Sequence, residues 1–354
     1  MANKWLKDLR KEDDIVDFEY DAYSKENSYP APTPYFGWIL ATKSHMIPSK
    51  GSVLLFSQPK AGKSLLSAAM VSTILEQDKD KDSTAIYINS ELRGSLQKDM
   101  LKPEIRDRVL MKDTNDAVAI FDWINDTIVP RVQDGMPLRV IVIDSLSNIM
   151  GVKRKDTESI SQHLMGDSAI TIQLGLQRLV PFCRKNNILL IATAQMRANF
   201  DGGPYAPKFK MQSSFGVKHT FDWFISLARA GAAEDKSSIL GETYEDQDIK
   251  DARGNKILNG HKIYVKSEES SVGPSGRSGI ITISYDHGVC DQWEEVFWLG
   301  KNTGIIKTEN NRTYEFNGQK FNGKKECALA IRDNPKLFSE ILEEVRKLDD
   351  QKKS

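Results

Sequence analysis

One short segment, residues 51–66, constrains the fold more than any other part of the chain. Its sequence is Gly-Ser-Val-Leu-Leu-Phe-Ser-Gln-Pro-Lys-Ala-Gly-Lys-Ser-Leu-Leu. The apolar run Val53–Phe56 predicts a buried parallel strand, and the apolar spacing that follows predicts a helix. A strand, a loop of small residues ending in Gly-Lys-Ser and a helix, in that order, are typical of a phosphate-binding loop. The segment therefore predicts an α/β fold with a nucleotide site.

The chemistry of such a loop assigns a role to several of its residues. Backbone N–H groups at the helix N-terminus face the β-phosphate, Lys63 brings a positive charge to the β- and γ-phosphates, and the Ser64 hydroxyl ligates Mg²⁺. Ser57 stands where a glycine is usual, and Pro59 stiffens the loop. A chance Gly-Lys-Ser at an ordinary helix start is the alternative, which the flanking strand and helix disfavour. The residues expected to bind the nucleotide are Ser57, Gln58, Pro59, Lys60, Ala61, Gly62, Lys63, Ser64, Leu65 and Asp144.

Composition limits the class of protein. A chain of 354 residues suits one large or two small domains. No apolar stretch approaches the roughly 18 residues of a membrane helix, and the charged N-terminal segment is unlike a signal peptide. Three widely spaced cysteines suit a cytoplasmic protein better than a disulfide framework or a zinc site. Because 49 basic residues balance 49 acidic ones, binding to nucleic acid would have to rest on local patches.

The chain is expected to divide into three parts. Residues 1–33 form a charged N-terminal arm, which is either a frayed end or a contact with a neighbouring subunit. Residues 34–300 alternate strands with helices, as in a mostly parallel sheet flanked by helices, and residues 301–354 form a small C-terminal α+β element. The expected strands are Val53–Phe56, Thr84–Asn89, Arg139–Ile143, Ile188–Thr193, Trp223–Ala228, Ile263–Lys266, Gly279–Ser284, Trp293–Leu299, Ile305–Lys307 and Thr313–Phe316, and the expected helices are Leu65–Glu76, Val118–Val132, Ala169–Lys185 and one from about Pro335.

Three polar side chains each follow one of the expected strands. Asp144 can hold Mg²⁺ through water, although an Asp that only caps a turn is the alternative. Glu91 can polarise an attacking water, and Gln195 can bond to a γ-phosphate; each of these two signals is weak alone. Because ligands of open α/β sheets bind outside the carboxyl ends of the strands, these three side chains and Ser57 are expected to form one site.

Two loops are candidates for contact with single-stranded DNA. One, residues 150–167, follows Asp144 and contains a basic run; the other, residues 197–215, follows Gln195 and interleaves basic with aromatic residues. Cations beside aromatic rings suit phosphate pairing and base packing, although a basic run alone is more often a solvated surface. The expected DNA-binding residues are Lys153, Arg154, Lys155, Arg197, Phe200, Tyr205, Lys208, Phe209 and Lys210.

Taken together, these motifs resemble the RecA-type recombinases, most closely their phage UvsX-like branch. The resemblance spans about residues 34–348 and implies a RecA-like P-loop ATPase core. It implies Lys63 and Ser64 on phosphate and Mg²⁺, Asp144 at the metal, Glu91 as the catalytic carboxylate and Gln195 as the γ-phosphate sensor. Besides the Gly-Lys-Ser loop, the motifs that carry it are Tyr87-Ile-Asn-Ser-Glu91, Val142-Ile-Asp-Ser-Leu146, Ala194-Gln-Met-Arg197 and, in the tail, Gly304-Ile-Ile-Lys, Asn317-Gly-Gln-Lys and Arg332-Asp-Asn-Pro335.

The resemblance implies an ATP- and Mg²⁺-dependent recombinase that forms helical filaments on single-stranded DNA and promotes homologous pairing and strand exchange with double-stranded DNA. A single-strand-binding protein and a loader or mediator would be further partners, in the cytoplasm of a host if the chain is phage-encoded. In that family, cations from a neighbouring subunit reach the γ-phosphate. Lys266 matches the first of them, Glu268 replaces the second, and Arg277 is a candidate to compensate. Lys98 or its neighbours stand where an adenine-stacking aromatic is usual.

Three rival functions stay open. A hexameric DNA helicase with the same core should carry an arginine finger and a primase or collar domain. A recombinase paralogue or mediator would bind DNA without strand exchange, and Glu268 keeps that alternative alive. An ATP-driven clock or signalling ATPase would lack both the Arg332-Asp-Asn-Pro335 motif and the basic-aromatic loop.

Overall fold

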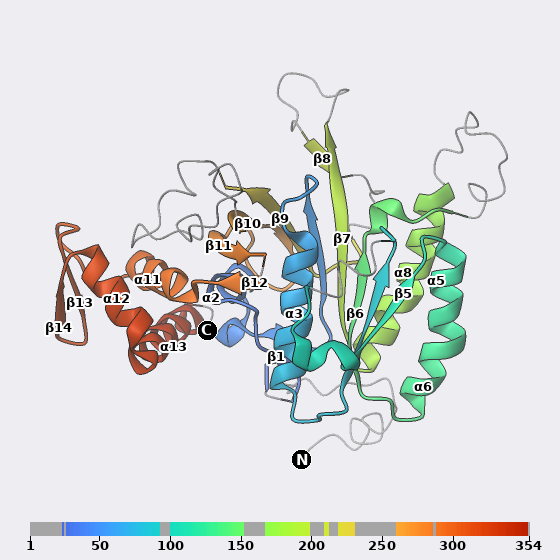
Figure 1. Ribbon diagram of the computed structural model, residues 1–354, viewed down its shortest axis with the longest axis horizontal. Helices are drawn as coiled ribbons and strands as arrows, with labels where there is room; N and C mark the ends of the chain where they lie inside the picture. Colours follow the sequence, from blue (N-terminus) through green and yellow to red (C-terminus); the bar gives the residue numbers. More distant parts are fainter. Residues whose placement is uncertain are drawn as a thin grey trace, which may run out of the picture.

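The computed structural model describes residues 23–24, 26–92, 100–151, 167–198, 209–211, 219–230, 260–285 and 288–352. Within them the chain forms a mixed α/β fold around one large, mostly parallel sheet with helices on both faces (Figure 1). The strands are β1 (Ser28–Tyr29), β2 (Ile47–Pro48), β3 (Ser52–Ser57), β4 (Thr84–Asn89), β5 (Val109–Asp113), β6 (Leu138–Asp144), β7 (Leu189–Ala198), β8 (Phe209–Met211), β9 (Trp223–Arg229), β10 (Gly260–Ser270), β11 (Ser278–Ser284), β12 (Gly288–Cys290), β13 (Thr313–Phe316) and β14 (Gln319–Asn322). The α-helices are α2 (Pro34–Ile39), α3 (Lys63–Gln77), α5 (Ala117–Trp123), α6 (Val129–Gln133), α8 (Asp167–Lys185), α11 (Gln292–Thr303), α12 (Lys324–Asp333) and α13 (Pro335–Gln351).

The order of strands in the large sheet is β12-β11-β10-β9-β3-β7-β6-β4-β5, and β8 pairs with β7 beside this path. Neighbouring strands are parallel from β9 to β5. They are antiparallel from β9 to β12. In the parallel part, Ser57 of β3 lies opposite Gln195 of β7, and Asn89 of β4 lies opposite Asp144 of β6. The carboxyl ends of four strands therefore reach the same edge of the sheet.

Two hydrophobic layers cover the sheet, one on each face. Alternate residues of the parallel strands point into each layer, so that Val53 and Leu55 of β3 lie in one and Leu54 and Phe56 in the other. The first layer is closed by α2, α3 and the C-terminal helices, and the second by α5, α8 and a π-helical turn at Ile124–Ile128. Since both faces of β3 are buried, its near-continuous apolar run is what a central parallel strand requires.

The segment Trp293–Leu299, expected to be a strand, is instead part of helix α11. Its apolar and aromatic residues suit a strand by propensity, but four consecutive residues, Glu294–Phe297, are all buried, so this segment packs on more than one side. Val296 and Phe297 precede Gly300 by four and three residues, and all three are buried. Gly300 lies against the side chain of Ile306, so the packing of α11 on the C-terminal element decides the conformation.

The other expected elements are mostly present. The helix expected at Val118–Val132 is a continuous helical segment from α5 to α6, interrupted by the π turn. The prediction of a strand at Ile305–Lys307 is wrong, because this segment contributes only a single β-bridge, between Lys307 and Glu315. Residue 300, the expected end of the core, lies inside α11. Strand β1 belongs to the expected N-terminal arm and pairs with β2. No helix in the described part of the chain has the length and apolar character needed to cross a lipid bilayer.

The last turn of α13 packs on the core through a buried ionic cluster. The Asp349 carboxylate accepts hydrogen bonds from Arg277 Nη1 at 2.9 Å and Nη2 at 2.6 Å, and His45 Nε2 lies 3.1 Å from Asp349 Oδ2. The Arg277 guanidinium also lies over the Trp38 ring, 5.0 Å from its centroid. Arg277 is thus engaged by its own chain, and a role as a compensating cation beside Lys266 would require it to leave this cluster.

Replacing Asp349 by Asn should destabilise the protein measurably. The substitution keeps the shape of the side chain but leaves the partly buried Arg277 guanidinium without its counter-charge, at a cost of about 2 kcal/mol, less than for a fully buried pair. We expect that loss in the free energy of unfolding, measured by chemical denaturation of the full chain. Asp333→Asn, at an exposed carboxylate beside Arg332, is the control and should change little. Equal losses in the two variants would show that the buried cluster does not hold α13 in place.

Candidate active site

The Gly-Lys-Ser loop joins the buried strand β3 to helix α3. Gln58, Pro59 and Lys60 are exposed, whereas Ala61 and Lys63 are buried. Gly62 precedes the helix with a φ of 98°, a left-handed conformation that favours glycine. The first turn of α3 has no side-chain cap and no acidic residue. Its N-terminal N–H groups and positive dipole end are therefore suited to an anion.

Lys63 lies at the centre of the candidate site and is only 7% exposed. Its Nζ donates hydrogen bonds to Ser57 Oγ at 2.9 Å and to the Gln58 carbonyl at 3.3 Å. Ser57 thus provides an acceptor for the lysine at the position where the usual loop has glycine. Burial lowers the pKa of Lys63, and the carboxylates of Asp144 and Glu91 oppose that shift. The ammonium therefore lies within electrostatic reach of both acids.

Asp144, at the end of β6, is fully buried. Its Oδ2 accepts a hydrogen bond from the Tyr87 hydroxyl at 2.7 Å, and its Oδ1 accepts one from the Thr193 hydroxyl at 2.5 Å. The Tyr87 hydroxyl also interacts with the Ser64 side chain, while burial and the Asp144 charge raise the pKa of Tyr87 well above its ordinary value. Tyr87 therefore links the two residues expected at the metal. Sequence reasoning assigned no role to Tyr87 or Thr193, although each is a polar side chain inside an apolar strand.

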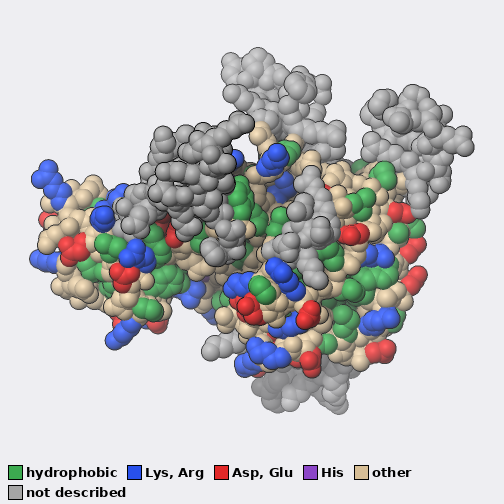
Figure 2. Space-filling view, viewed as in Figure 1, with side chains coloured by type: hydrophobic (Ala, Val, Ile, Leu, Met, Phe, Trp, Pro, Cys, Tyr) green, Lys and Arg blue, Asp and Glu red, His purple; other side chains and the backbone are tan. Residues whose placement is uncertain are grey.

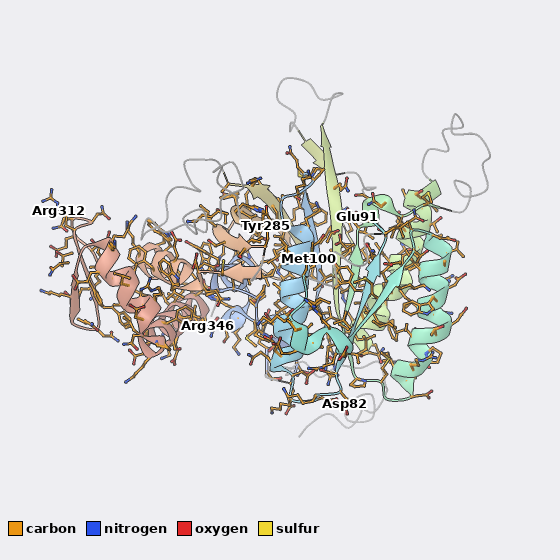
Figure 3. The ribbon with its side chains drawn as sticks, in the orientation of Figure 1. Asp82, Glu91, Met100, Tyr285, Arg312 and Arg346 are labelled. Carbon is orange, nitrogen blue, oxygen red and sulfur yellow. The ribbon has the colours of Figure 1, made fainter. Side chains whose placement is uncertain are left out.

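Glu91 and Gln195 are in direct contact. Gln195 Nε2 donates a hydrogen bond to Glu91 Oε1 at 3.2 Å, and the Gln195 backbone N–H donates one to Ser147 Oγ at 2.7 Å. Gln195 is not at the end of its strand as expected, because β7 continues to Ala198. The extension has a partner, since β8 pairs with Met196–Ala198. The expected convergence of Ser57, Glu91 and Gln195 is present all the same, and Figure 3 shows Glu91 at this end of the sheet.

Lys266 lies on β10, away from these residues. Its Nζ pairs with Glu268 Oε2 at 2.6 Å, and Glu268 Oε1 accepts a hydrogen bond from Ser226 Oγ at 2.7 Å. The hydrogen bond to Glu268 raises the pKa of Lys266. Both side chains are partly exposed. No contact of the described residues brings Lys266 to Lys63 within one chain.

Most of the expected DNA-binding residues lie outside the described residues: Lys153, Arg154, Lys155, Phe200, Tyr205 and Lys208. The backbone of the remaining three is described, with Arg197 opposite Lys210 and Ala198 opposite Phe209 in the β7–β8 pair. The second loop therefore leaves and re-enters the described structure as two antiparallel strands. Lys98, at the expected adenine-stacking position, also lies outside the described residues.

A cavity of about 410 Å³ begins beside the first turn of α3. It is lined by Leu65 and Ala69 of α3, by Met100, and by Tyr285 and Gly288. Figure 3 labels Met100 and Tyr285, which lie near α3. The sequence analysis did not identify this cavity, because its walls come from segments far apart in the chain. Leu65 directly follows Ser64, so the cavity is next to the Gly-Lys-Ser loop.

The described residues contain no cluster of three or more His, Cys, Asp or Glu side chains that could hold a metal ion alone. A divalent cation at Ser64 and Asp144 would therefore need oxygens from a bound anion as well. Acidic and basic side chains are interspersed over the face of the molecule in Figure 2, in agreement with the zero net charge. Comparison of the chain with models of protein families and with curated proteins found no match.

Replacing Gly62 by Ala should cost more stability than the same change at Gly135. Both glycines have a left-handed φ, near 100°, so each alanine suffers about 1 kcal/mol of backbone strain. A Cβ at Gly62 would also approach Ile283 Cδ1 to 2.8 Å, whereas one at Gly135 meets nothing within 4 Å. We expect Gly62→Ala to lose about 1 kcal/mol more in the free energy of unfolding. Equal losses would show that the loop does not pack tightly on β11.

Proposed function

We propose that this chain is an ATP-dependent homologous recombinase with a RecA-like core, which forms helical filaments on single-stranded DNA and promotes homologous pairing and strand exchange. The observation that carries the proposal is the Glu91–Gln195 hydrogen bond beside Lys63. It joins a carboxylate suited to water activation to a strand that continues into the β7–β8 pair. The resemblance of the motifs to RecA-type recombinases supports the same function.

The residues around α3 suit the binding of a nucleoside triphosphate with Mg²⁺. The buried Lys63 ammonium would neutralise phosphate charge, and the first turn of α3 would donate backbone N–H groups. Ser64 and Asp144 would hold Mg²⁺, directly and through water respectively, and the bound ion would offset charge on the β- and γ-phosphates. Tyr87 and Thr193 hold the Asp144 carboxylate in place. The cavity at Leu65, Met100 and Tyr285 is the nearest candidate for the base.

Glu91 and Gln195 would couple hydrolysis to DNA binding. Glu91 can accept a proton from the attacking water. The Gln195 amide can exchange its bond with Glu91 for one with a γ-phosphate oxygen. Because Gln195 and Arg197 lie on the same continuous strand, that exchange would shift the loop of residues 197–215. Binding of ATP would thereby favour the conformation of the loop that holds single-stranded DNA.

Lys266 would act in the site of a neighbouring copy. In the sheet, β9 separates β10 from β3, and the partly exposed Lys266 side chain makes no described contact with its own site. Its pairing with Glu268 would have to be broken or shared with the phosphate.

Further partners would be a single-strand-binding protein and a loader or mediator, in the cytoplasm of the cell.

The deciding experiment is a joint-molecule assay with ATP, single-stranded DNA and a homologous duplex, run beside negative-stain imaging. Strand exchange together with filaments supports the proposal. Unwinding by closed rings would identify a helicase, and binding without joint molecules would identify a mediator. ATP hydrolysis at one rate with and without single-stranded DNA, with no change in assembly, would overturn the proposal.

Glu91→Gln should slow ATP hydrolysis by roughly 10²–10⁴-fold, because the amide cannot accept the proton from water. Filaments on single-stranded DNA should persist, since the amide keeps the shape of the side chain. Steady-state phosphate release and imaging measure the two effects. Glu309→Gln, at an exposed loop carboxylate, is the matched control for Glu91→Gln. Lys63→Ala should abolish hydrolysis. If Glu91→Gln abolished DNA binding as well, Glu91 would have a structural role.

Neutralising Lys208 and Lys210 together should weaken binding to single-stranded DNA of every sequence. Each lost phosphate contact lowers the slope of log affinity against log salt concentration by ~0.7. Fluorescence anisotropy with labelled oligonucleotides at several salt concentrations measures that slope. Lys320 and Lys325, neutralised together in the C-terminal element, serve as the control pair with the same change in charge. An unchanged slope in the Lys208 and Lys210 variant would exclude that loop from the DNA contact.

A further inference from the structure

A second cavity, of about 240 Å³, lies where α2 and α11 meet the antiparallel strands β10 and β11. None of its lining residues belongs to the candidate active site. A Cβ on Gly279 of β11 would lie 2.6 Å from the Tyr35 ring, so the glycine lets this ring lie directly against the strand. The side chains that matter here are Tyr35 of α2, Lys262 and Tyr264 of β10, and Glu294, Glu295 and Trp298 of α11.

One basic and two acidic side chains are buried at this cavity. Lys262, Glu294 and Glu295 are only 4%, 6% and 2% exposed. The Lys262 ammonium donates hydrogen bonds to both Glu294 oxygens, at 3.3 and 3.2 Å. Two carboxyl groups therefore face one ammonium group, which leaves Glu295 without a counter-charge of its own in the described lining.

The Glu295 carboxyl group is also incompletely hydrogen-bonded. Its Oε2 accepts a hydrogen bond from the Tyr35 N–H at 2.7 Å, but its buried Oε1 has no partner among the described residues. Burial raises the pKa of Glu295 to about 8; hydrogen bonds from Tyr35 and Thr33 oppose the shift, and the Glu294 and Asp291 charges add to it. Ionising this buried carboxyl group is therefore costly without a counter-charge.

We propose that this cavity binds a small organic cation, a guanidinium or primary ammonium group on an unbranched alkyl stem. Such a group would enter the cavity as a counter-charge to the Glu295 carboxylate, in place of the proton that this carboxyl group otherwise carries. Aromatic rings attract cations over their faces, and Tyr35, Tyr264 and Trp298 line the space. The volume is below the roughly 300–1,000 Å³ of drug-sized sites, so the ligand is small or is one side chain. Tyr264 is 37% exposed, which places the opening at β10.

Binding of the cation should depend on pH in a defined direction. Below pH 8 Glu295 is protonated, so the cation must displace one proton when it binds. Affinity is therefore expected to rise tenfold per pH unit up to about pH 8 and to level off above it. The other ionisable groups that face Glu295 are Glu294 of α11, Asp291 just before that helix, Tyr35 of α2 and Lys262 of β10.

Isothermal titration of the full chain with n-propylguanidinium at pH 7 and pH 8 tests the proposal, with N-propylurea as the neutral analogue. We expect binding about fivefold tighter at pH 8, because the deprotonated fraction of Glu295 rises from about one tenth to about one half, and no binding of the urea. Glu295→Gln should weaken binding at least tenfold, while Glu309→Gln should bind as the wild type does. Tyr264→Ala, which changes only an exposed wall and leaves the buried pair in place, should weaken binding several-fold even if Glu295→Gln fails to fold.

Sedimentation velocity of the chain alone identifies the source of the cation. If an Arg or Lys side chain of a second copy occupies the cavity, saturating n-propylguanidinium and Glu295→Gln should both reduce self-association. If the occupant is a free small molecule, titration should show binding while assembly is unchanged. No heat of binding, equal affinity for the urea, or unchanged affinity in both variants would overturn the proposal and leave a water-filled cavity only. Neither measurement uses nucleotide or DNA, so its outcome is independent of the proposed recombinase function.

Discussion

The candidate active site depends on one electrostatic constraint, the burial of the Lys63 ammonium. A buried charge is tolerated only when opposite charges and hydrogen bonds replace its hydration. For Lys63 these come from the ends of different strands: Ser57 of β3, Asp144 of β6 and Glu91 after β4. The site therefore exists only while the strand register holds, with Ser57 opposite Gln195 and Asn89 opposite Asp144. A slip of one residue would turn every side chain of a strand to the opposite face and separate Lys63 from its partners.

The hydrophobic layers are what hold that register. Strands β3, β4, β6 and β7 contribute alternate buried residues to both layers, so a slip would exchange side chains of different size between two close-packed layers. The antiparallel half of the sheet is different, because β10 carries exposed and partly exposed residues at Tyr264, Lys266 and Glu268 on one face. That half is free to present charged groups to a partner, as the proposed role of Lys266 in a neighbouring site requires.

Sequence reasoning predicted the parallel half of the sheet well, and it also predicted β13 and the start of α13. It failed for two segments between β12 and β13, Trp293–Leu299 and Ile305–Lys307. Strands such as Thr84–Asn89 were predictable because their residues are buried on both faces, which makes the apolar run unambiguous. The segment Trp293–Leu299 was not, since its aromatic residues favour a strand and only their packing against Ile306 and α13 makes it helical. In the site, the polar ends of the strands could be read from the chain. The links made by Tyr87 and Thr193 could not, because they depend on which strands are neighbours.

Lys63 and Glu295 show two outcomes of the same constraint. Both are buried ionisable groups, but Lys63 has two carboxylates within electrostatic reach and Glu295 faces further acids. Nearby carboxylates limit the fall in the pKa of Lys63. Burial raises the pKa of Glu295 to about 8 and nearby acids add to the shift, so that this group keeps its proton at neutral pH. A site with its charges already balanced gains little from a further ion. At Glu295 the charge is balanced only by a proton, which a cation from outside can replace, so this group is the better indicator of an external ligand.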